Sequence, residues 1–262
     1  MTDSASTASA DDVVLVDVSD GVAVVTMNRP DARNALNTAL RTTLPVRLRE
    51  LDADPDVAAM VLTGADPAFC AGLDLKEIST QGLGSGGATE PTGLPFDGLT
   101  KPLIGAVNGP AVTGGFELAL GCDFLIASER ASFADTHARV GVMPGWGLTV
   151  FLPQAIGIRR AKQMSFTGNY VDAETALDWG LVNMVVPHAE LIATARSLAM
   201  DMATIPPANL AAIKGAYAAA NDPVDGPAIA AEKAYNRSWT FDQEALAENR
   251  EAIQARGSSQ AT

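Results

Sequence analysis

Two glycine-containing loops carry the residues best suited to chemistry. Residues 69–75 (FCAGLDL) follow the apolar run VLTG, and residues 109–117 (GPAVTGGFE) follow the run LIGAV. Each loop is expected to open a helix, whose first turn has N–H groups without internal acceptors. Two such groups that converge on one point form an oxyanion hole, which stabilises negative charge developing on a carbonyl oxygen. Either loop alone is typical of an ordinary tight turn, but the two together, followed directly by Glu117, favour a catalytic site.

The composition argues against several other classes of protein. The chain has 18 Lys and Arg against 31 Asp and Glu, and this net charge of −13 argues against a nucleic-acid-binding surface. The most apolar stretch, residues 103–127, contains charged residues and a proline, so it is predicted to be buried core and not a membrane span. The two histidines and two cysteines are not spaced as metal ligands, so no metal site is expected.

The N-terminus and the cysteine content indicate a cytoplasmic protein. Residues 1–12 lack the basic and apolar regions of a signal peptide and are predicted to form a disordered tail. Cys70 and Cys122 are too few for a disulfide framework in a chain of this length, and both are expected to be buried. A reducing compartment is the simplest location for such a chain.

The elements that must position the loops alternate between strands and helices. Residues 13–18 and 22–27 are β-branched runs that predict a hairpin, and 57–62, 103–107 and 123–127 predict further strands. Leucines spaced three to four residues apart between Leu36 and Leu51 predict a helix, in which Pro45 requires either a kink or a restart. This alternation is typical of an α/β core.

The rest of the chain divides into a long loop and a helical end. Residues 79–99 are rich in Gly, Ser, Thr and Pro and predict a loop. From about residue 149 onward the pattern is helical. We therefore expect a core over residues 13–200 and a helical C-terminal region over residues 201–262. Asp123 is expected to cap or end the helix that follows Glu117.

Taken in order along the chain, the motifs resemble those of the crotonase, or enoyl-CoA hydratase/isomerase, family. The resemblance extends over nearly the whole length. Besides the two loops, it rests on NRP at 28–30, NAL at 34–36, KP at 101–102, CD at 122–123 and GVMPG at 141–145. It implies an α/β fold with a spiral of ββα units in two roughly perpendicular sheets, and a helical C-terminal region that serves trimer assembly. It also implies acyl-CoA thioester substrates, no separate cofactor, and a homotrimer or a dimer of trimers.

Carried over by position, the resemblance implies that the backbone N–H groups of Leu73 and Gly114 grip the thioester oxygen and stabilise an enolate. Basic residues near these loops are suited to the anionic coenzyme on an otherwise acidic protein, although each one singly is also typical of solvated surface charge. The residues implied in substrate binding are Arg29, Ala32, Arg33, Leu73, Asp74, Leu75, Lys76, Gly114 and Trp146.

The acid/base residues depart from the family in part. Glu117 matches one of the two hydratase glutamates, which activates the attacking water in that mechanism. His137 stands where the family carries its second acid, which makes a monofunctional isomerase less favoured than a hydratase. A histidine with a reference pKa near 6.5 is able to exchange protons near neutral pH, or it only closes the pocket. Asp135 is the alternative second carboxylate if the loop register differs.

Trp146 is a second departure, because many relatives have a small residue there. The tryptophan either shortens the acyl pocket or packs in the core. The first hypothesis is hydration of a 2-enoyl-CoA to a 3-hydroxyacyl-CoA. Two alternatives remain: another reaction on an acyl-CoA, such as hydrolysis or carbon–carbon cleavage, and a protein that binds acyl-CoA without turnover.

Overall fold

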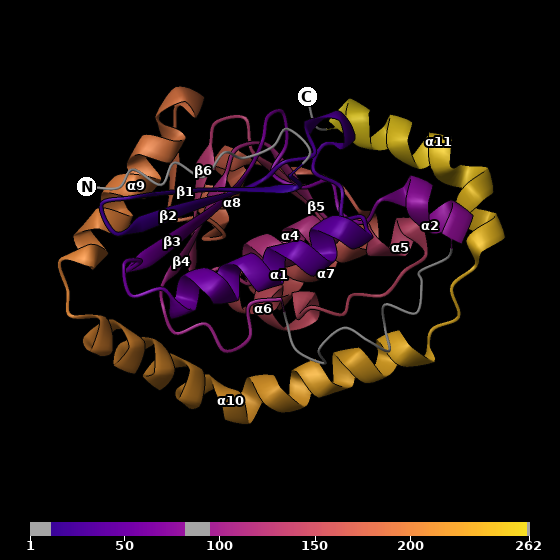
Figure 1. Ribbon diagram of the computed structural model, residues 1–262. Coiled ribbons are helices and arrows are strands. Elements are labelled where there is room, and N and C mark those ends of the chain that lie inside the picture. The colour runs from indigo at the N-terminus through magenta and orange to yellow at the C-terminus, as the bar shows by residue number, and fades with distance from the viewer. Residues whose placement is uncertain (1–11, 82–94, 261–262) are drawn as a thin grey trace.

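Two β-sheets form the centre of the molecule in the computed structural model, which describes residues 12–81 and 95–260 (Figure 1). The larger sheet has the strand order β1-β2-β3-β4-β6-β9, and the smaller sheet has the order β5-β7-β8. The strands are β1 (Val14–Ser19), β2 (Val22–Met27), β3 (Ala59–Gly64), β4 (Leu103–Val107), β5 (Pro110–Val112), β6 (Phe124–Ser128), β7 (Ser132–Ala134), β8 (Val171–Asp172) and β9 (Met184–Val186).

The predicted N-terminal hairpin and the α/β alternation are confirmed. β1 and β2 pair antiparallel, and Asp20 and Gly21 turn between them with φ of +52° and +76°. From β2 onward every pairing in the larger sheet is parallel. Parallel neighbours require crossover connections, which is why helices separate most of these strands in the sequence.

Both faces of the larger sheet are covered, which explains its apolar strands. In β3, Met60 and Leu62 belong to the main core, on the side where α1 (Thr38–Ala53) contributes its buried leucines. Ala59 and Val61 face the other way and pack with α9 (Leu191–Ala203). A strand buried on both faces has no polar alternation, and β3 has none.

Helix α1 continues through Pro45, so the helix does not restart there. The Asn37 side chain accepts a hydrogen bond from the Leu40 N–H and caps the start of the helix. A proline inside a helix costs about 3 kcal/mol. Burial of four leucines, each contributing about 2 kcal/mol, offsets that cost. They are Leu40, Leu44, Leu48 and Leu51.

The smaller sheet and the first loop position the starts of three short helices. α4 (Gly114–Leu120) begins directly after β5, and α5 (His137–Val140) begins shortly after β7. The Thr113 N–H donates to the Ala134 carbonyl over 2.9 Å, so the two helix starts lie side by side. α2 (Leu75–Gln81) follows the first glycine loop. The prediction that each glycine loop opens a helix is therefore confirmed.

The C-terminal part is largely helical, with two strands that the sequence pattern missed. β8 and β9 are two and three residues long, too short to show periodicity, and β9 is the edge of the larger sheet. Pro206 lies between α9 and the next helix, and Pro207 is the first residue of that helix. The helices here are α6 (Leu148–Ile156), α7 (Ile158–Thr167), α8 (Ala173–Trp179), α10 (Pro207–Ser238) and α11 (Gln243–Gln260), and two 3-10 turns span Pro30–Ala32 and His188–Glu190.

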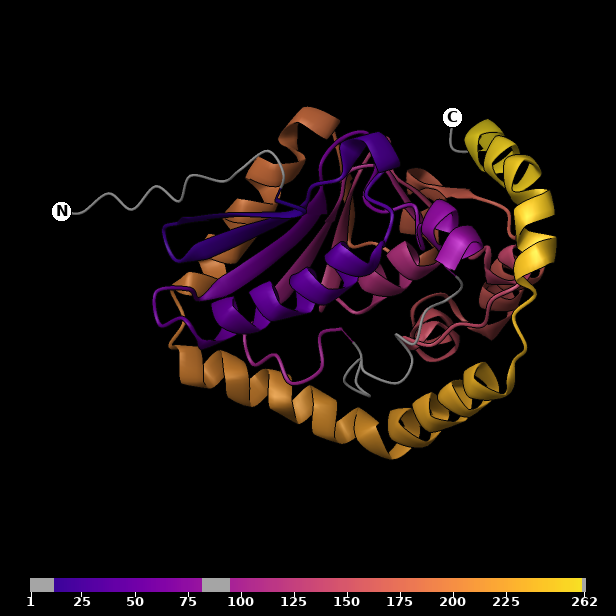
Figure 2. The same cartoon turned by 45° about the vertical axis from the view of Figure 1, so that its right-hand side comes forward.

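The last two helices run around the outside of the sheets. α10 follows the lower edge of the molecule in both views, and α11 returns to lie beside α2 (Figures 1 and 2). Among the described helices, none combines the length and the apolar character needed to cross a bilayer.

Three sequence-based expectations differ from the structure or fall partly outside the described residues. Asp123 does not cap or end α4, which ends at Leu120. Its carboxylate instead accepts from the Leu103 N–H at 2.7 Å and the Lys214 ammonium at 2.8 Å, joining β4 to α10. The predicted 79–99 loop begins later, because α2 reaches Gln81, and residues 82–94 lie outside the described residues. The predicted N-terminal tail, apart from Asp12, lies outside them too.

Candidate active site

The two glycine loops lie against each other through their backbones. Cys70 N–H donates to the Pro110 carbonyl at 3.1 Å, and Val112 N–H donates to the Cys70 carbonyl at 2.9 Å. Gly72 has φ of +86°, and a Cβ there would lie 2.7 Å from the Val112 oxygen and 3.5 Å from the Gly114 nitrogen. Among the described residues, neither the Leu73 nor the Gly114 N–H group has a hydrogen-bond acceptor. The arrangement therefore leaves two unused donors on adjacent backbone segments.

A buried asparagine anchors the first loop, and sequence reasoning did not single it out. The Asn34 amide donates to the carbonyls of Ala65 (2.8 Å) and Ala68 (2.7 Å), while its oxygen accepts from the Arg29 N–H (2.8 Å). Its side chain is fully buried. These bonds tie the turn after β2 to the segment after β3, which leads into residues 69–75. The NAL motif was visible in the sequence, but nothing in it indicated this role.

Glu117 projects from the first turn of α4 into the interior. The residue is 5% exposed, and its Oε1 accepts hydrogen bonds from the N–H groups of Gly145 (3.1 Å) and Trp146 (2.8 Å). These bonds hold the carboxylate against the segment that follows α5. Its second oxygen, Oε2, lies 3.4 Å from Nε2 of His137.

His137 lies between two carboxylates. Its Nδ1 is 2.7 Å from Oδ1 of Asp135, on the opposite side of the ring from Glu117. Burial lowers the pKa of His137, but the charge of Glu117 and the hydrogen bond to Asp135 outweigh burial and raise it to about 9. Burial likewise works to raise the pKa of Asp135, but its hydrogen bond to His137 and the charge of His137 outweigh it, and the pKa is lowered.

The structure thus brings Glu117 and His137 together and separates Asp135 from the role of second acid. Because Asp135 contacts the far nitrogen of the imidazole, its carboxylate does not reach the Glu117 side of the ring. The geometry therefore favours His137 over Asp135 as the group that faces Glu117.

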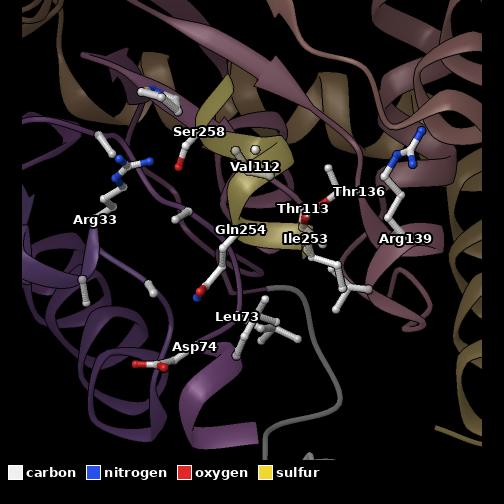
Figure 3. A pocket seen from close by; sticks show the side chains of 18 of the residues that line it. Arg33, Leu73, Asp74, Val112, Thr113, Thr136, Arg139, Ile253, Gln254 and Ser258 are labelled. Atoms are coloured by element: carbon white, nitrogen blue, oxygen red, sulfur yellow. Dashed lines mark hydrogen bonds between the residues drawn. The ribbon is translucent and has the colours of Figure 1, made fainter. Parts of the chain in front are cut away.

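A cavity of about 650 Å³ lies next to the two glycine loops. Five cationic and two acidic side chains are among its lining residues, in a chain of net charge −13. In Figure 3, Arg33 and Ser258 lie on one side of it and Arg139 on the other. Predicted binding residues that line the cavity are Arg29, Ala32, Arg33, Leu73, Asp74, Leu75 and Lys76.

Gly114, Glu117, His137 and Trp146 do not line the cavity. Their chain neighbours Thr113 and Thr136 do, and the hydroxyls of these two threonines lie 2.5 Å apart (Figure 3). The threonine pair is therefore the part of the cavity wall that directly precedes Gly114 and His137 in the chain.

Trp146 is half-buried and packs against the main core, with its ring 3.8 Å from the position of a Cβ on Gly114.

The Arg29 side chain forms an ion pair of 3.0 Å with Asp74. Both residues line the cavity, but the pair neutralises its own charge. The positive charge that the cavity offers to an anionic ligand therefore comes from its other basic residues.

The last helix supplies a wall of the cavity that sequence reasoning missed. Ile253, Gln254 and Arg256 of α11 line it, together with Arg139 and Tyr170. The Arg256 Nε atom is shielded from solvent and has no hydrogen-bond partner within the described part of the chain. No local signal could have found the three α11 residues, because they lie more than 170 positions from the loops at 29–33 and 71–76.

Helix α10 holds the segment that binds Glu117. The buried Glu232 carboxylate accepts from the N–H groups of Gly147 (2.6 Å) and Thr149 (2.7 Å) and from the Thr149 hydroxyl (2.5 Å). Four residues on, the Asn236 amide donates to the carbonyls of Met143 (2.7 Å) and Pro144 (3.1 Å). One helix thus supports the residues on both sides of Gly145.

Both cysteines are free and buried, as predicted. Burial raises the pKa of the Cys70 thiol to about 12 and raises that of Cys122 further, so neither thiol ionises near neutral pH. Among residues 12–81 and 95–260, no group of three or more His, Cys, Asp or Glu is arranged to hold a metal ion.

The two sheets, the paired glycine loops and the buried carboxylate agree with the resemblance read from the motifs. A family model described as enoyl-CoA hydratase/isomerase matches residues 17–256. The chain belongs to this family and has the crotonase fold.

Individual relatives agree with that assignment. The crystal structure of an enoyl-CoA hydratase from Mycobacterium smegmatis is similar with a TM-score of 0.79 and 47% identity, covering 87% of this chain and 97% of that chain. An enoyl-CoA hydratase from Mycobacterium tuberculosis H37Rv gives 0.79 and 45%, covering 86% and 98%. A protein of Arabidopsis thaliana called probable enoyl-CoA hydratase 1, peroxisomal, is 41% identical over 184 residues, 69% of each chain.

Proposed function

We propose that the protein is an enoyl-CoA hydratase, a lyase that adds water across the double bond of a 2-enoyl-CoA to give a 3-hydroxyacyl-CoA. The observation that carries the proposal is the buried Glu117 carboxylate, 3.4 Å from His137 and next to two backbone segments with unused N–H donors. Relatives named as hydratases at 41% to 47% identity support it.

In this mechanism the N–H groups of Leu73 and Gly114 bind the thioester oxygen and stabilise the enolate. Glu117 accepts a proton from water as the oxygen bonds to Cβ, and His137 gives its Nε2 proton to Cα. The substrate gains one hydrogen and one hydroxyl. Glu117 then returns its proton to His137 across the short gap between them, which restores both groups for the next turnover. These steps use no metal or redox cofactor.

The cavity is the proposed site of the coenzyme A portion. Coenzyme A carries phosphates. The cations Arg33, Lys76, Arg139 and Arg256, which form no ion pair within the described part of the chain, line a space large enough for part of it. The Arg256 Nε that lacks a partner is a suitable donor to an anion. The Ala32 and Arg33 backbone and the Leu75 and Lys76 region contact the adenine and the tether, respectively, in this proposal.

A second candidate reaction is hydrolysis or carbon–carbon cleavage of an acyl-CoA. The Asp135–His137 contact of 2.7 Å favours it, because a histidine supported by a carboxylate is also the general base of many hydrolases. The two candidates differ in products, since hydrolysis releases a thiol and hydration does not. Binding of acyl-CoA without turnover remains the third alternative.

The experiment is incubation of the purified protein with a short panel of 2-enoyl-CoA esters, following loss of the conjugated thioester absorbance. Glu117→Gln is expected to lower kcat by about 1,000-fold with little change in KM, because the amide cannot take a proton. Glu174→Gln, the same change on an exposed carboxylate in the first turn of α8, is the control and should keep full activity.

Free thiol is measured in the same reactions. Thiol release without hydration would favour the second candidate, and binding of the esters without any product would sink both catalytic proposals.

Assembly and location are proposals of the same kind. We infer a homotrimer or a dimer of trimers, which the apolar side chains exposed on α10 support: Ile213, Tyr217, Val224 and Tyr235. The two free buried cysteines support a reducing compartment such as the cytoplasm.

A further inference from the structure

We propose that Asp135 is a positioning residue that holds His137 with a proton on each ring nitrogen, so that the proton on Nε2 is directed at Glu117. The proposal rests on the hydratase function above, because it assigns His137 the role of acid there. Its structural basis is one line of three buried side chains, Asp135, His137 and Glu117, each at most 5% exposed.

The contacts around the imidazole leave one protonation pattern. Oδ1 of Asp135 accepts from the backbone N–H of His137 (3.1 Å) and lies 2.7 Å from Nδ1, so Nδ1 carries a proton. A neutral ring would then present its Nε2 lone pair to the Glu117 carboxylate at 3.4 Å, where two acceptors repel. A proton on Nε2 removes that repulsion and adds an attraction between opposite charges. The imidazolium is therefore the form that fits between the two carboxylates.

Among residues 12–81 and 95–260, no other charged group acts on the ring. Glu117 faces it from α4 and Asp135 from the segment after β7, and these are the charges that act on it. Arg139, two residues further on in α5, turns outward and donates from Nε to the Thr167 carbonyl at 2.7 Å. Ser165 of α7 acts on the Asp135 carboxylate and not on the ring, and it helps to lower the pKa of Asp135. The ring is shielded from bulk solvent, since His137 is 4% exposed.

Asp135 thereby decides which way the proton moves. With the carboxylate at Nδ1, His137 enters the reaction as a donor, and Glu117 is left as the acceptor for the proton of water. An asparagine in place of Asp135 can present its NH₂ to Nδ1, which favours a neutral ring with its proton on Nε2, or its carbonyl, which supplies no charge. Either way the imidazolium loses one of its two negatively charged neighbours.

The test uses the histidine content of the chain. His137 and His188 are its only two histidines, so the ring signals in a ¹⁵N NMR spectrum belong to two residues, and His188→Gln assigns them. In the wild-type protein both nitrogens of His137 are expected to be protonated at pH 7.5. In Asp135→Asn the midpoint of the His137 titration is expected to fall by at least one pH unit.

Asp66→Asn is the matched control. Asp66 contacts the other histidine, with Oδ2 at 3.0 Å from Nε2 of His188, at a more exposed position. This variant should leave the His137 titration and the kinetics unchanged.

Kinetics give the second readout. For Asp135→Asn we expect kcat at pH 7.5 to fall about 100-fold with KM unchanged, and the basic limb of the kcat profile to move to lower pH. A merely structural role would not move that limb. An unchanged His137 titration in a folded Asp135→Asn variant would overturn the proposal.

A neutral His137 in the wild-type protein at pH 7.5 would overturn it too, and that measurement stands even if the variant does not fold. Neither spectrum depends on turnover. If the spectra are as expected and no ester is hydrated, the failure lies with the proposed function and not with the role of Asp135.

Discussion

At the scale of single residues, the absence of a side chain at position 72 shapes the candidate oxyanion site. Any Cβ at Gly72 would lie 2.7 Å from the Val112 oxygen, closer than real contacts allow, and φ is +86°. The glycine lets residues 69–73 approach β5, and this approach brings Leu73 and Gly114 together. The motif predicted a glycine-dependent turn here, but only the packing shows which atom a side chain would meet.

Gly72→Ala is expected to lower kcat by about 100-fold, because the Leu73 N–H must move away from Gly114. It should also lower the free energy of unfolding by about 2 kcal/mol or more. Steady-state kinetics and urea unfolding measure the two effects.

Gly180→Ala is the control that separates the effect of backbone strain from the effect of a change next to the candidate oxyanion site. Gly180 ends α8 with φ of +81°, and the nearest atom to a Cβ there is 3.6 Å away. This variant should lose about 1 kcal/mol of stability and no activity. Equal losses of kcat in both variants would contradict the oxyanion assignment.

At the scale of elements, α10 acts on the active site from outside the sheets. Its one buried residue, Glu232, binds the start of α6, and the same segment binds Glu117 through Gly145 and Trp146. A helix expected to serve assembly therefore also supports the candidate catalytic carboxylate. The sequence could not show this, because Glu232 is one charged residue among many on a mostly exposed helix.

Glu232→Gln is expected to lower the free energy of unfolding by about 2 kcal/mol, because an amide nitrogen would face backbone N–H donors in a buried site. kcat should fall as the Glu117 carboxylate loses its fixed orientation, while KM changes little, since the cavity is lined by other segments. Urea unfolding and steady-state kinetics are the measurements.

Asp222→Asn is the control on the same helix, because it removes the same charge from an exposed position. Its stability and kcat should match the wild type. A Glu232→Gln variant with wild-type stability and kcat would refute the support role of α10.

At the scale of the whole molecule, the His137 site links stability to pH. The pKa of His137 rises from 6.5 to about 9 on folding, which corresponds to roughly 3 kcal/mol. Because the folded pKa is raised, this contribution is fully present below pH 6.5. It is lost as the pH rises through about 9.

The difference in unfolding free energy between wild type and His137→Gln should therefore be greatest near pH 6 and smaller by about 3 kcal/mol at pH 10. Urea unfolding at fixed protein concentration measures it, since assembly would make stability depend on concentration. A difference that stays constant from pH 6 to pH 10 would show that His137 is not held as an imidazolium.

The sequence by itself determined the features that depend on local patterns. Two runs of β-branched residues joined by a short turn predicted the hairpin, leucine spacing predicted α1, and the glycine loops with Glu117 predicted the helix starts now seen as α2 and α4. These signals are readable because each depends on residues within a few positions of one another.

Only the tertiary structure decided which distant groups meet. Glu117 on His137, Glu232 under the Glu117 segment and α11 over the cavity depend on how the elements pack, and a pair such as 117 and 145 leaves no periodic trace in the sequence. The course of α1 through Pro45 was decided in the same way, because burial of its leucines outweighs a local penalty. Packing energy gathered over the whole core settles what local preference leaves open.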